Sequence, residues 1–422
     1  MGITVPPPRS RPRHAKPSQV RGVVASAEAR YLFSKAVPGA VSFVSVILYV
    51  RFMGEYQYGL ASLYLAGAAV AANILTGWTR QALLRESGAH RVDDVPTWVL
   101  ITVCVVAAPF VIGLGVVSTG SDTTLPAVIA GGLFAVVSCA QSLALADVQS
   151  AQMPGVYARL EIIRALVGFA LGIVACLVLP FAWGLLVALA GGMVAGTFRG
   201  KRVAPATRRI LSRAEVGEWW RYGWPMAFWL AGSTIVQFAD RFVITAVNGP
   251  AAAGHYSALY DIVVRGAGMV LIPFVLAGHP RVMALWNDDR RAEAVVECRS
   301  MLRKQNLLSA VVLVLGAAAS PLVARIIGLD PEPFDAVTVI LLLVTSILWQ
   351  TALILHKPLE IDRRSRSMLI YMMVAIVVSI GLAVLLVPPL GGVGAACAAL
   401  AGPATYLAFC APSWHRMKRQ VL

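Results

Sequence analysis

Charged residues are scarce in this chain and absent from long stretches of it. Asp, Glu, Lys and Arg make up 14% of its 422 residues, whereas 58% are hydrophobic. A soluble domain of average composition would be about a quarter charged. The charges gather between apolar blocks that are long enough for a helix to cross roughly 30 Å of hydrocarbon, and the short alternating segments of a membrane barrel are missing. The sequence therefore predicts an all-α polytopic membrane protein.

Paired cysteines and catalytic motifs are missing as well. None of the six cysteines lies at the spacing of a metal or redox site, so we interpret them as small buried apolar residues. The chain has no P-loop, no His–Glu metal motif and no G-x-S-x-G nucleophile motif. Its loops are too short to form a nucleotide-hydrolysing domain. We therefore expect a protein that is not an enzyme and that has no cofactor and no metal site.

The apolar blocks predict about twelve transmembrane helices in two six-helix lobes. A long basic linker at 199–221 separates an N-lobe, residues 30–198, from a C-lobe, residues 222–412, and basic tails cover residues 1–29 and 413–422. We expect the first tail to be irregular because it is rich in proline and arginine. The expected spans are 31–52, 57–78, 97–118, 125–148, 158–179, 181–198, 222–248, 252–280, 305–328, 336–356, 367–388 and 391–412.

The positive charges indicate how the chain lies in the membrane. The net charge is +15, and arginines and lysines gather in both tails and in the loops 199–221 and 281–304. The loop 328–335, "GLDPEPFD", carries neither residue type. By the positive-inside rule, both termini and all basic loops are cytoplasmic. Because such charges suit anionic lipid headgroups, we expect a multi-pass protein of the cytoplasmic membrane that binds no nucleic acid.

The two lobes resemble each other in sequence. Arg30-Tyr31 opens the first span and Arg221-Tyr222 opens the seventh, and each of these spans ends in a turn bounded by glycines, "GEYQYG" at 54–59 and "GPAAAG" at 249–254. Both lobes start in the cytoplasm and hold an even number of spans. We therefore predict parallel repeats with a cleft between them that supports alternating access. The residues expected at equivalent tight turns are Gly54, Gly59, Gly249 and Gly254.

Charged side chains inside the seventh and eighth spans are the main candidates for a functional site. A charge at the centre of a membrane costs about 2.5–3.5 kcal/mol on insertion scales, so it needs a partner or water. Arg241 and Gln237 share a polar stripe of the seventh span, and Asp240 lies beside it. Asp261 and Arg265 are one turn apart on the eighth span and can form a pair there. The four charges form either a neutral clamp between two helices or the lining of a hydrated cavity.

Other polar residues in the spans also have two interpretations. Arg51, near the end of the first span, is either an interfacial anchor or a cavity residue. Asn73 favours an interhelical hydrogen bond over a ligand contact. Glu161 and Arg164 are spaced for an ion pair along one helix.

Several stretches resemble a known family of membrane transporters. The segment 238–265, "FADRFVITAVNGPAAAGHYSALYDIVVR", is similar to the mid-chain signature of polysaccharide flippases. "GWTRQALLRESG" resembles their first cytoplasmic loop, and "VPPLGGVGAACAAL" resembles their link between spans eleven and twelve. Over residues 30–412 the chain resembles the polysaccharide branch of the multidrug/oligosaccharidyl-lipid/polysaccharide (MOP) flippase superfamily, the O-antigen or capsule-type Wzx-like flippases. The signature residues are Asp240, Arg241, Gly249, Gly254 and Tyr256.

The resemblance implies a central cationic cavity and a defined cargo. That cargo is an undecaprenyl-diphosphate-linked oligosaccharide, moved from the inner to the outer leaflet with energy from an ion gradient or the membrane potential. Polysaccharide assembly proteins are the implied partners, besides the lipid bilayer. Guanidinium groups suit phosphate oxygens. The residues assigned to substrate binding are Arg241, Arg265, Gln237 and Arg51, and those assigned to coupling or ion pairing are Asp240 and Asp261.

Two other classes of function stay open. A multidrug/cation antiporter of the same superfamily would carry acidic residues in the spans of its first lobe. Arginine outnumbers acidic residues inside the spans of this chain, which favours an anionic substrate. A membrane-embedded glycan polymerase or ligase would carry a large outer loop, and the outer loops here are short.

Overall fold

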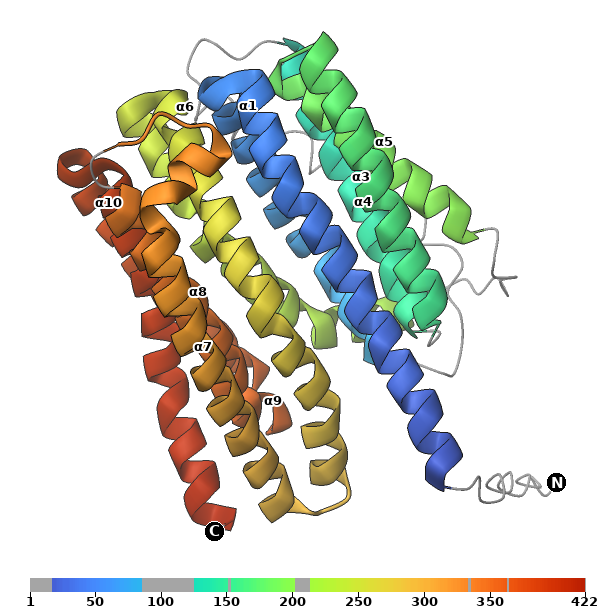
Figure 1. The fold of residues 1–422 in the computed structure, drawn as a ribbon. Helices are drawn as coiled ribbons and strands as arrows, with labels where there is room; N and C mark the ends of the chain where they lie inside the picture. Colours follow the sequence, from blue (N-terminus) through green and yellow to red (C-terminus); the bar gives the residue numbers. More distant parts are fainter. Residues whose placement is uncertain are drawn as a thin grey trace.

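The computed structural model describes residues 17–85, 125–150, 153–201, 213–332, 335–362 and 364–421, and within these ranges the chain is helical, with no strand (Figure 1). Long apolar stretches explain the long helices, because a helix satisfies its own backbone groups in lipid. The helices are α1 (Pro17–Arg85), α3 (Leu125–Ser150), α4 (Pro154–Val178), α5 (Ala182–Lys201), α6 (Arg213–Asn287), α7 (Arg291–Ile327), α8 (Asp335–Leu355), α9 (Lys357–Ile361) and α10 (Ser365–Val421).

Three of the long helices reverse direction at a glycine. The backbone leaves the helical region at Gly54 in α1, with φ of 77°, at Gly249 in α6, with φ of 88°, and at Gly391 in α10, with φ of 53°. A residue with a side chain is strained at these angles, whereas glycine is not. Each reversal falls at or beside a predicted span boundary, so α1, α6 and α10 each contribute two apolar segments.

The helices confirm an all-α multi-pass membrane protein. Seven of them are long and apolar enough to cross a membrane, with each kinked helix counted once, and α5 is a shorter apolar helix. The predicted spans 158–179 and 181–198 correspond to α4 and α5, which only residues 179–181 separate. The predicted span 97–118 lies outside the described residues, so the total of twelve stays a prediction.

Helices extend into segments outside the predicted spans, including part of the first tail, which we expected to be irregular. Helix α1 begins at Pro17, inside the predicted tail, and α10 continues to Val421 through the other tail. The predicted loop 281–304 consists of the end of α6, a turn at 288–290 and the start of α7. The prediction of an irregular first tail was wrong from Pro17 onward, because hydropathy marks where the membrane ends, whereas a helix can continue beyond that point.

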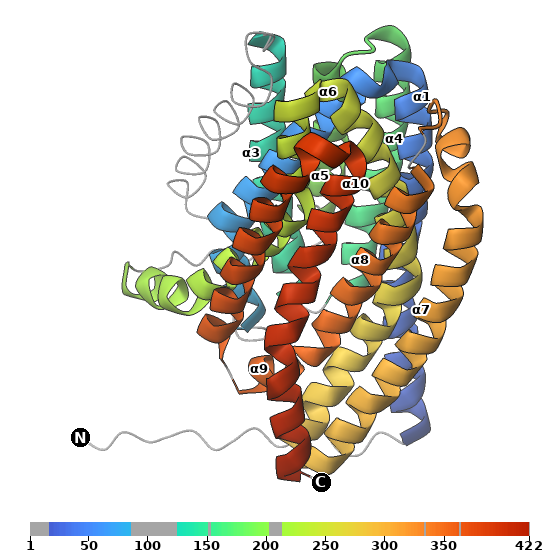
Figure 2. The ribbon, with the colours of Figure 1, turned by 90° about the vertical axis from the view of Figure 1, so that its left-hand side faces the viewer.

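The helices form two groups that meet along α1 and α6 (Figures 1 and 2). Helices α3, α4 and α5 pack with α1, whereas α7, α8 and α10 pack with α6. We call these the first and second bundle. The reversals of α1 and α6 and the α7–α8 connection lie at the top of Figure 1, which we call the upper end; the turn between α6 and α7 and the C-terminus lie at the lower end.

At the upper end the two bundles touch through their backbones. A side chain on Gly59 would overlap the carbonyl oxygen of Pro250, and one on Gly254 would overlap the carbonyl oxygen of Glu55. Deeper along the same helices the hydroxyls of Ser62 and Ser257 are 3.1 Å apart, and these serines are 195 residues apart in sequence, as are Gly59 and Gly254. Residues at equivalent positions meet where an axis of a parallel repeat would pass. We therefore keep the repeat as a proposal that this register supports.

This contact makes Gly254→Ala an informative substitution. We expect it to lower the stability of the protein by about 1–3 kcal/mol, because the added methyl group must push apart two backbones. The measurement is the thermal transition of the purified full-length protein in detergent. Gly381→Ala is the matched control, because nothing lies within 4 Å of the added carbon; its transition should be unchanged or higher. Equal transitions for both variants would contradict the close contact.

Candidate functional site

A cavity of about 470 Å³ lies between the first bundle and α6. Its walls come from α1, α3, α4, α5 and both halves of α6. The reversal at Gly249 sets the position of the charged groups, because it turns α6 back so that residues of its two halves come together. The charged residues that line the cavity are Arg164, Arg241, Asp261 and Arg265.

Arg241 is the most buried cation of this site. Its residue is 1% exposed, and its Nη2 donates a hydrogen bond of 2.7 Å to Oδ1 of Asp261. The guanidinium carbon lies 4.6 Å from the ring centre of Phe238 and 4.8 Å from that of Tyr260. Both distances fit cation–π contacts. Its Nε has no hydrogen-bond partner among the described residues, so this guanidinium retains a donor.

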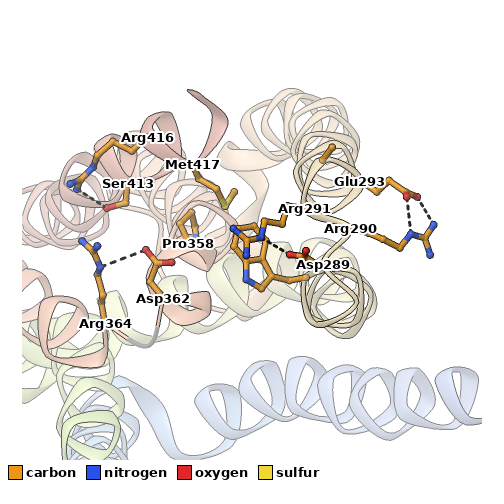
Figure 3. A pocket seen from close by; sticks show the side chains of 12 residues that line it. Asp289, Arg290, Arg291, Glu293, Pro358, Asp362, Arg364, Ser413, Arg416 and Met417 are labelled. Atoms are coloured by element: carbon orange, nitrogen blue, oxygen red, sulfur yellow. Dashed lines mark hydrogen bonds and ion pairs between the residues drawn. The ribbon is translucent and has the colours of Figure 1, made fainter. Parts of the chain in front are cut away.

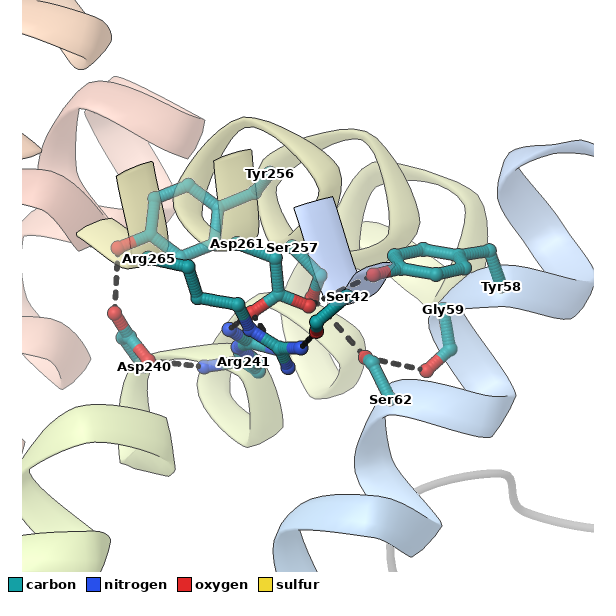
Figure 4. Close-up of polar contacts among 10 residues, drawn as sticks. All are labelled: Ser42, Tyr58, Gly59, Ser62, Asp240, Arg241, Tyr256, Ser257, Asp261 and Arg265. Atoms are coloured by element: carbon teal, nitrogen blue, oxygen red, sulfur yellow. Dashed lines mark hydrogen bonds and ion pairs between the residues drawn. The ribbon is translucent and has the colours of Figure 1, made fainter. Parts of the chain in front are cut away.

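Asp261 contacts Arg241 and Arg265 and also a residue of the first bundle (Figure 4). Its Oδ2 accepts a hydrogen bond of 2.7 Å from the hydroxyl of Tyr58, which belongs to α1. Its Oδ1 lies 3.4 Å from Nη2 of Arg265, one turn along α6, in addition to the contact with Arg241. A carboxylate that is almost fully buried needs such partners, because an unpaired charge in this environment is costly.

Arg265 differs from Arg241 because it reaches open space. Its side chain is 42% exposed, and its Nη1 donates a hydrogen bond of 2.5 Å to the hydroxyl of Ser42 in α1. A guanidinium has five N–H donors. Arg265 therefore presents donors to the cavity while Asp261 and Ser42 hold its orientation.

Asp240 is buried beside this group but does not line the cavity. Its Oδ2 accepts a hydrogen bond of 2.5 Å from the hydroxyl of Tyr256, and its Oδ1 accepts one of 2.9 Å from the backbone N–H of Arg241. Tyr256 comes from the second half of α6, so this bond also ties the two halves of the helix together. Asp240 thus holds the backbone that positions Arg241.

The structure brings four predicted site residues together and leaves two apart. Gln237 donates from Nε2 to the carbonyl oxygen of Ser233, 2.9 Å away, on its own helix. Arg51 is exposed near the upper end of α1, and its stem lies close to Gly328. Neither residue lines the cavity. The residues that come together are Asp240, Arg241, Asp261 and Arg265.

Sequence reasoning missed the aromatic and hydroxyl partners of the charges. Tyr58 and Ser42 lie on α1, far in sequence from Asp261 and Arg265. The one available signal was the position of Tyr58 in the sequence. It directly precedes Gly59, where the two bundles touch. Side-chain periodicity along one helix cannot reveal such a partner.

Two structural predictions about other polar residues are confirmed. Asn73 donates a hydrogen bond of 2.9 Å from Nδ2 to the hydroxyl of Thr234, which joins α1 to α6. Glu161 and Arg164 form an ion pair of 3.1 Å along α4. Arg164 also lines the cavity, so it adds a third guanidinium to the lining.

A second pocket, at the lower end, has a different charge balance (Figure 3). Its volume is about 520 Å³, and it lies where α9, the start of α7 and the ends of α6 and α10 meet. Three of its arginines already face carboxylates at 2.5 to 3.5 Å, as the pairs Arg290–Glu293, Arg291–Asp289 and Arg364–Asp362. In this pocket three carboxylates pair with three of the four arginines, whereas in the upper cavity Arg241 and Arg265 share the single carboxylate of Asp261. The upper cavity is therefore the better candidate for an anionic ligand.

Comparisons with known proteins agree with this fold. The sequence profile of the family described as "Polysaccharide biosynthesis protein" matches residues 31–286. No curated protein gives a significant match.

Solved structures of MOP superfamily transporters match nearly the whole chain. An inward-facing multidrug resistance MATE family transporter has 14% identity and a TM-score of 0.57, with coverage of 93% of this chain and 94% of that chain. An outward-facing one has 13% identity and a TM-score of 0.62, covering 94% and 95%. A MOP superfamily transporter from Pyrococcus furiosus Vc1 (DSM3638) has 14% identity and a TM-score of 0.63, covering 94% and 95%. The chain therefore belongs to the polysaccharide biosynthesis protein family and has the fold of MOP superfamily transporters.

Proposed function

We propose that this membrane transporter is a flippase for a polyprenyl-diphosphate-linked oligosaccharide, working by alternating access in the cytoplasmic membrane. The observation that carries the proposal is the charged lining of the cavity, where Arg241 and Arg265 share the single carboxylate of Asp261. Arg164, paired with Glu161, adds a third guanidinium. A diphosphate presents several oxygens to which guanidinium forks bind in pairs. Arg265, with its exposed donors, is the first contact, and Arg241, which is 1% exposed, lines the same cavity.

The remaining lining suits the sugars rather than the lipid. Hydroxyls of Ser42, Tyr58 and Ser62 lie in the same cavity as the arginines, and such groups bind sugar hydroxyls. The apolar polyprenyl chain is stable in the bilayer and needs no protein path, so we expect only the polar head to enter the cavity. The cargo would thus cross with its head inside the protein and its tail in lipid.

The polarity of the cavity argues against a multidrug/cation antiporter. A cationic drug needs an unpaired carboxylate, whereas Asp261 and Asp240 are both held by hydrogen bonds. For the Pyrococcus furiosus transporter, the reverse polarity of the binding pocket is said to suggest a different function. We therefore use the polarity of the pocket to distinguish a flippase from a multidrug/cation antiporter with this fold.

Export in cells tests the proposal. We expect cells that lack the protein to retain the lipid-linked oligosaccharide in the inner leaflet, where an impermeant glycosidase added to spheroplasts cannot reach it. Supplying the wild-type chain should restore its digestion. Normal digestion without the protein, together with lost resistance to a cationic drug, would favour the antiporter.

Orientation in the membrane follows from the proposal and has its own test. We expect the lower end to be cytoplasmic, because the basic segments gather there. A cysteine at Glu332, near the upper end, should react with an impermeant maleimide in intact cells, and a cysteine at Ser212, in the basic linker, should react only after lysis. Reaction at position 212 in intact cells would overturn this orientation.

A further inference from the structure

A histidine joins the two bundles at the upper end, outside the cavity. The Nδ1 of His255, in α6, lies 3.2 Å from Oε1 of Glu55 in α1, and its Nε2 lies 2.9 Å from Oδ1 of Asp335 at the start of α8. The His255 side chain is 6% exposed, whereas that of Glu55 is 33% exposed. The ring therefore bridges the first and second bundles beside the glycine contact, since His255 directly follows Gly254.

The two contacts together require an additional proton. A neutral imidazole has one N–H donor and one acceptor nitrogen, and an ionised carboxylate only accepts. Both ring nitrogens face carboxylate oxygens at hydrogen-bond distance. If His255 were neutral and both acids were ionised, the lone pair of one ring nitrogen would face a carboxylate oxygen, and that contact would be repulsive. The closed arrangement therefore holds one proton more than a neutral histidine with two ionised carboxylates does. A protonated ring, with two N–H donors, satisfies both contacts.

The surrounding charges reinforce this requirement. The carboxylates that face the ring among the described residues come from three segments: Glu55 of α1, Glu332 of the α7–α8 connection and Asp335 of α8. The backbone N–H of Glu332 donates to Oδ2 of Asp335, 2.8 Å away, and so fixes that carboxylate. Arg51 lies four residues before Glu55, on the other side of the reversal at Gly54, and belongs to the first bundle. Loss of the proton would leave three carboxylates around a neutral ring and would push the two bundles apart.

We propose that His255, Glu55 and Asp335 form a proton-binding latch, which closes the upper end of the transporter when it is protonated and releases it when it is not. The proton enters from the water at the upper end, past Glu55, onto a ring nitrogen and leaves by the same route. The proposal rests on alternating access in the proposed function, but it does not depend on the identity of the cargo. It also identifies the proton as the ion that sets which end is open.

Distance measurements on the protein without any glycan test the latch. Spin labels at Phe181→Cys and Val247→Cys, in a background without native cysteines, report the separation of the bundles, because both residues are exposed and lie at upper-end turns of different bundles. We expect the full-length protein in lipid nanodiscs with a chelator to show short distances at about pH 5 and longer ones at about pH 9. A distribution that does not change with pH would overturn the proposal.

Variants separate the latch from a general effect of pH. Glu55→Gln should keep the upper end closed at alkaline pH, because an amide can donate to the neutral ring, and His255→Gln should abolish the response to pH. Glu293→Gln, an exposed carboxylate at the lower end, is the control and should respond as the wild type does. A Glu55→Gln variant that opens as the wild type does would contradict the latch. The last outcome concerns zinc, which could bind to His255, Glu332 and Asp335. If added zinc closed the upper end at constant alkaline pH, the latch would respond to a metal ion rather than to a proton, and the proposal would be overturned.

Discussion

Arg265→Ala is expected to reduce export of the lipid-linked oligosaccharide about 10- to 100-fold while folded protein remains at the wild-type level. Hydrogen bonds to a charged group contribute about 1.5–3 kcal/mol, and each 1.4 kcal/mol is a factor of ten. The Arg265 side chain is partly exposed in the cavity, so its removal creates no buried hole. Asp261 keeps its bonds to Arg241 and Tyr58, which is why the fold should tolerate the change.

The measurement is export in cells relative to the amount of protein in the membrane. Arg265→Lys should recover little, because an ammonium group lacks the planar fork that holds two oxygens. Arg325→Ala is the matched control, because Arg325 is exposed on α7 and does not line the cavity. Wild-type export by Arg265→Ala would show that the site is a structural clamp.

Asp261→Ala is expected to have the largest effect on stability. It removes the partner of Arg241, which is fully buried, and breaking a buried pair by removing one partner costs about 3–5 kcal/mol. The thermal transition and the yield of membrane-inserted protein should both fall. The double variant Arg241→Met/Asp261→Leu should regain much of the stability, because apolar residues can replace a buried pair, yet it should not export. Full stability of Asp261→Ala would contradict the burial of Arg241.

The geometry also changes what an exchange of Asp261 and Arg265 would test. From sequence, the two residues form a pair along one helix, so an exchange would preserve a simple clamp. In the structure Asp261 also binds Arg241 and Tyr58. An exchange would place a second arginine against Arg241 whatever the role of the site. Single substitutions at Arg265 therefore separate the cavity and clamp interpretations better than the exchange does.

Local pattern accounts for part of this fold and site. The gap between the apolar blocks on either side of Gly249 predicted the reversal of α6, and the spacing of Asp261 and Arg265 predicted their contact. The bond between Tyr58 and Asp261 joins residues 203 positions apart, and no periodicity along one helix contains that information. Similarly, His255 reads in the sequence as one of several histidines at span ends. Its role depends on Glu55 and Asp335, which come from two other helices.

Transport by the purified protein tests the central claim most directly. The protein is reconstituted in liposomes that contain a fluorescent polyprenyl-diphosphate-linked oligosaccharide, and an impermeant quencher reports how fast the label moves between leaflets. The account predicts movement with the wild type and with Arg325→Ala, and little movement with Arg265→Ala or without protein. No movement with the wild type, or equal rates for the wild type and Arg265→Ala, would contradict it.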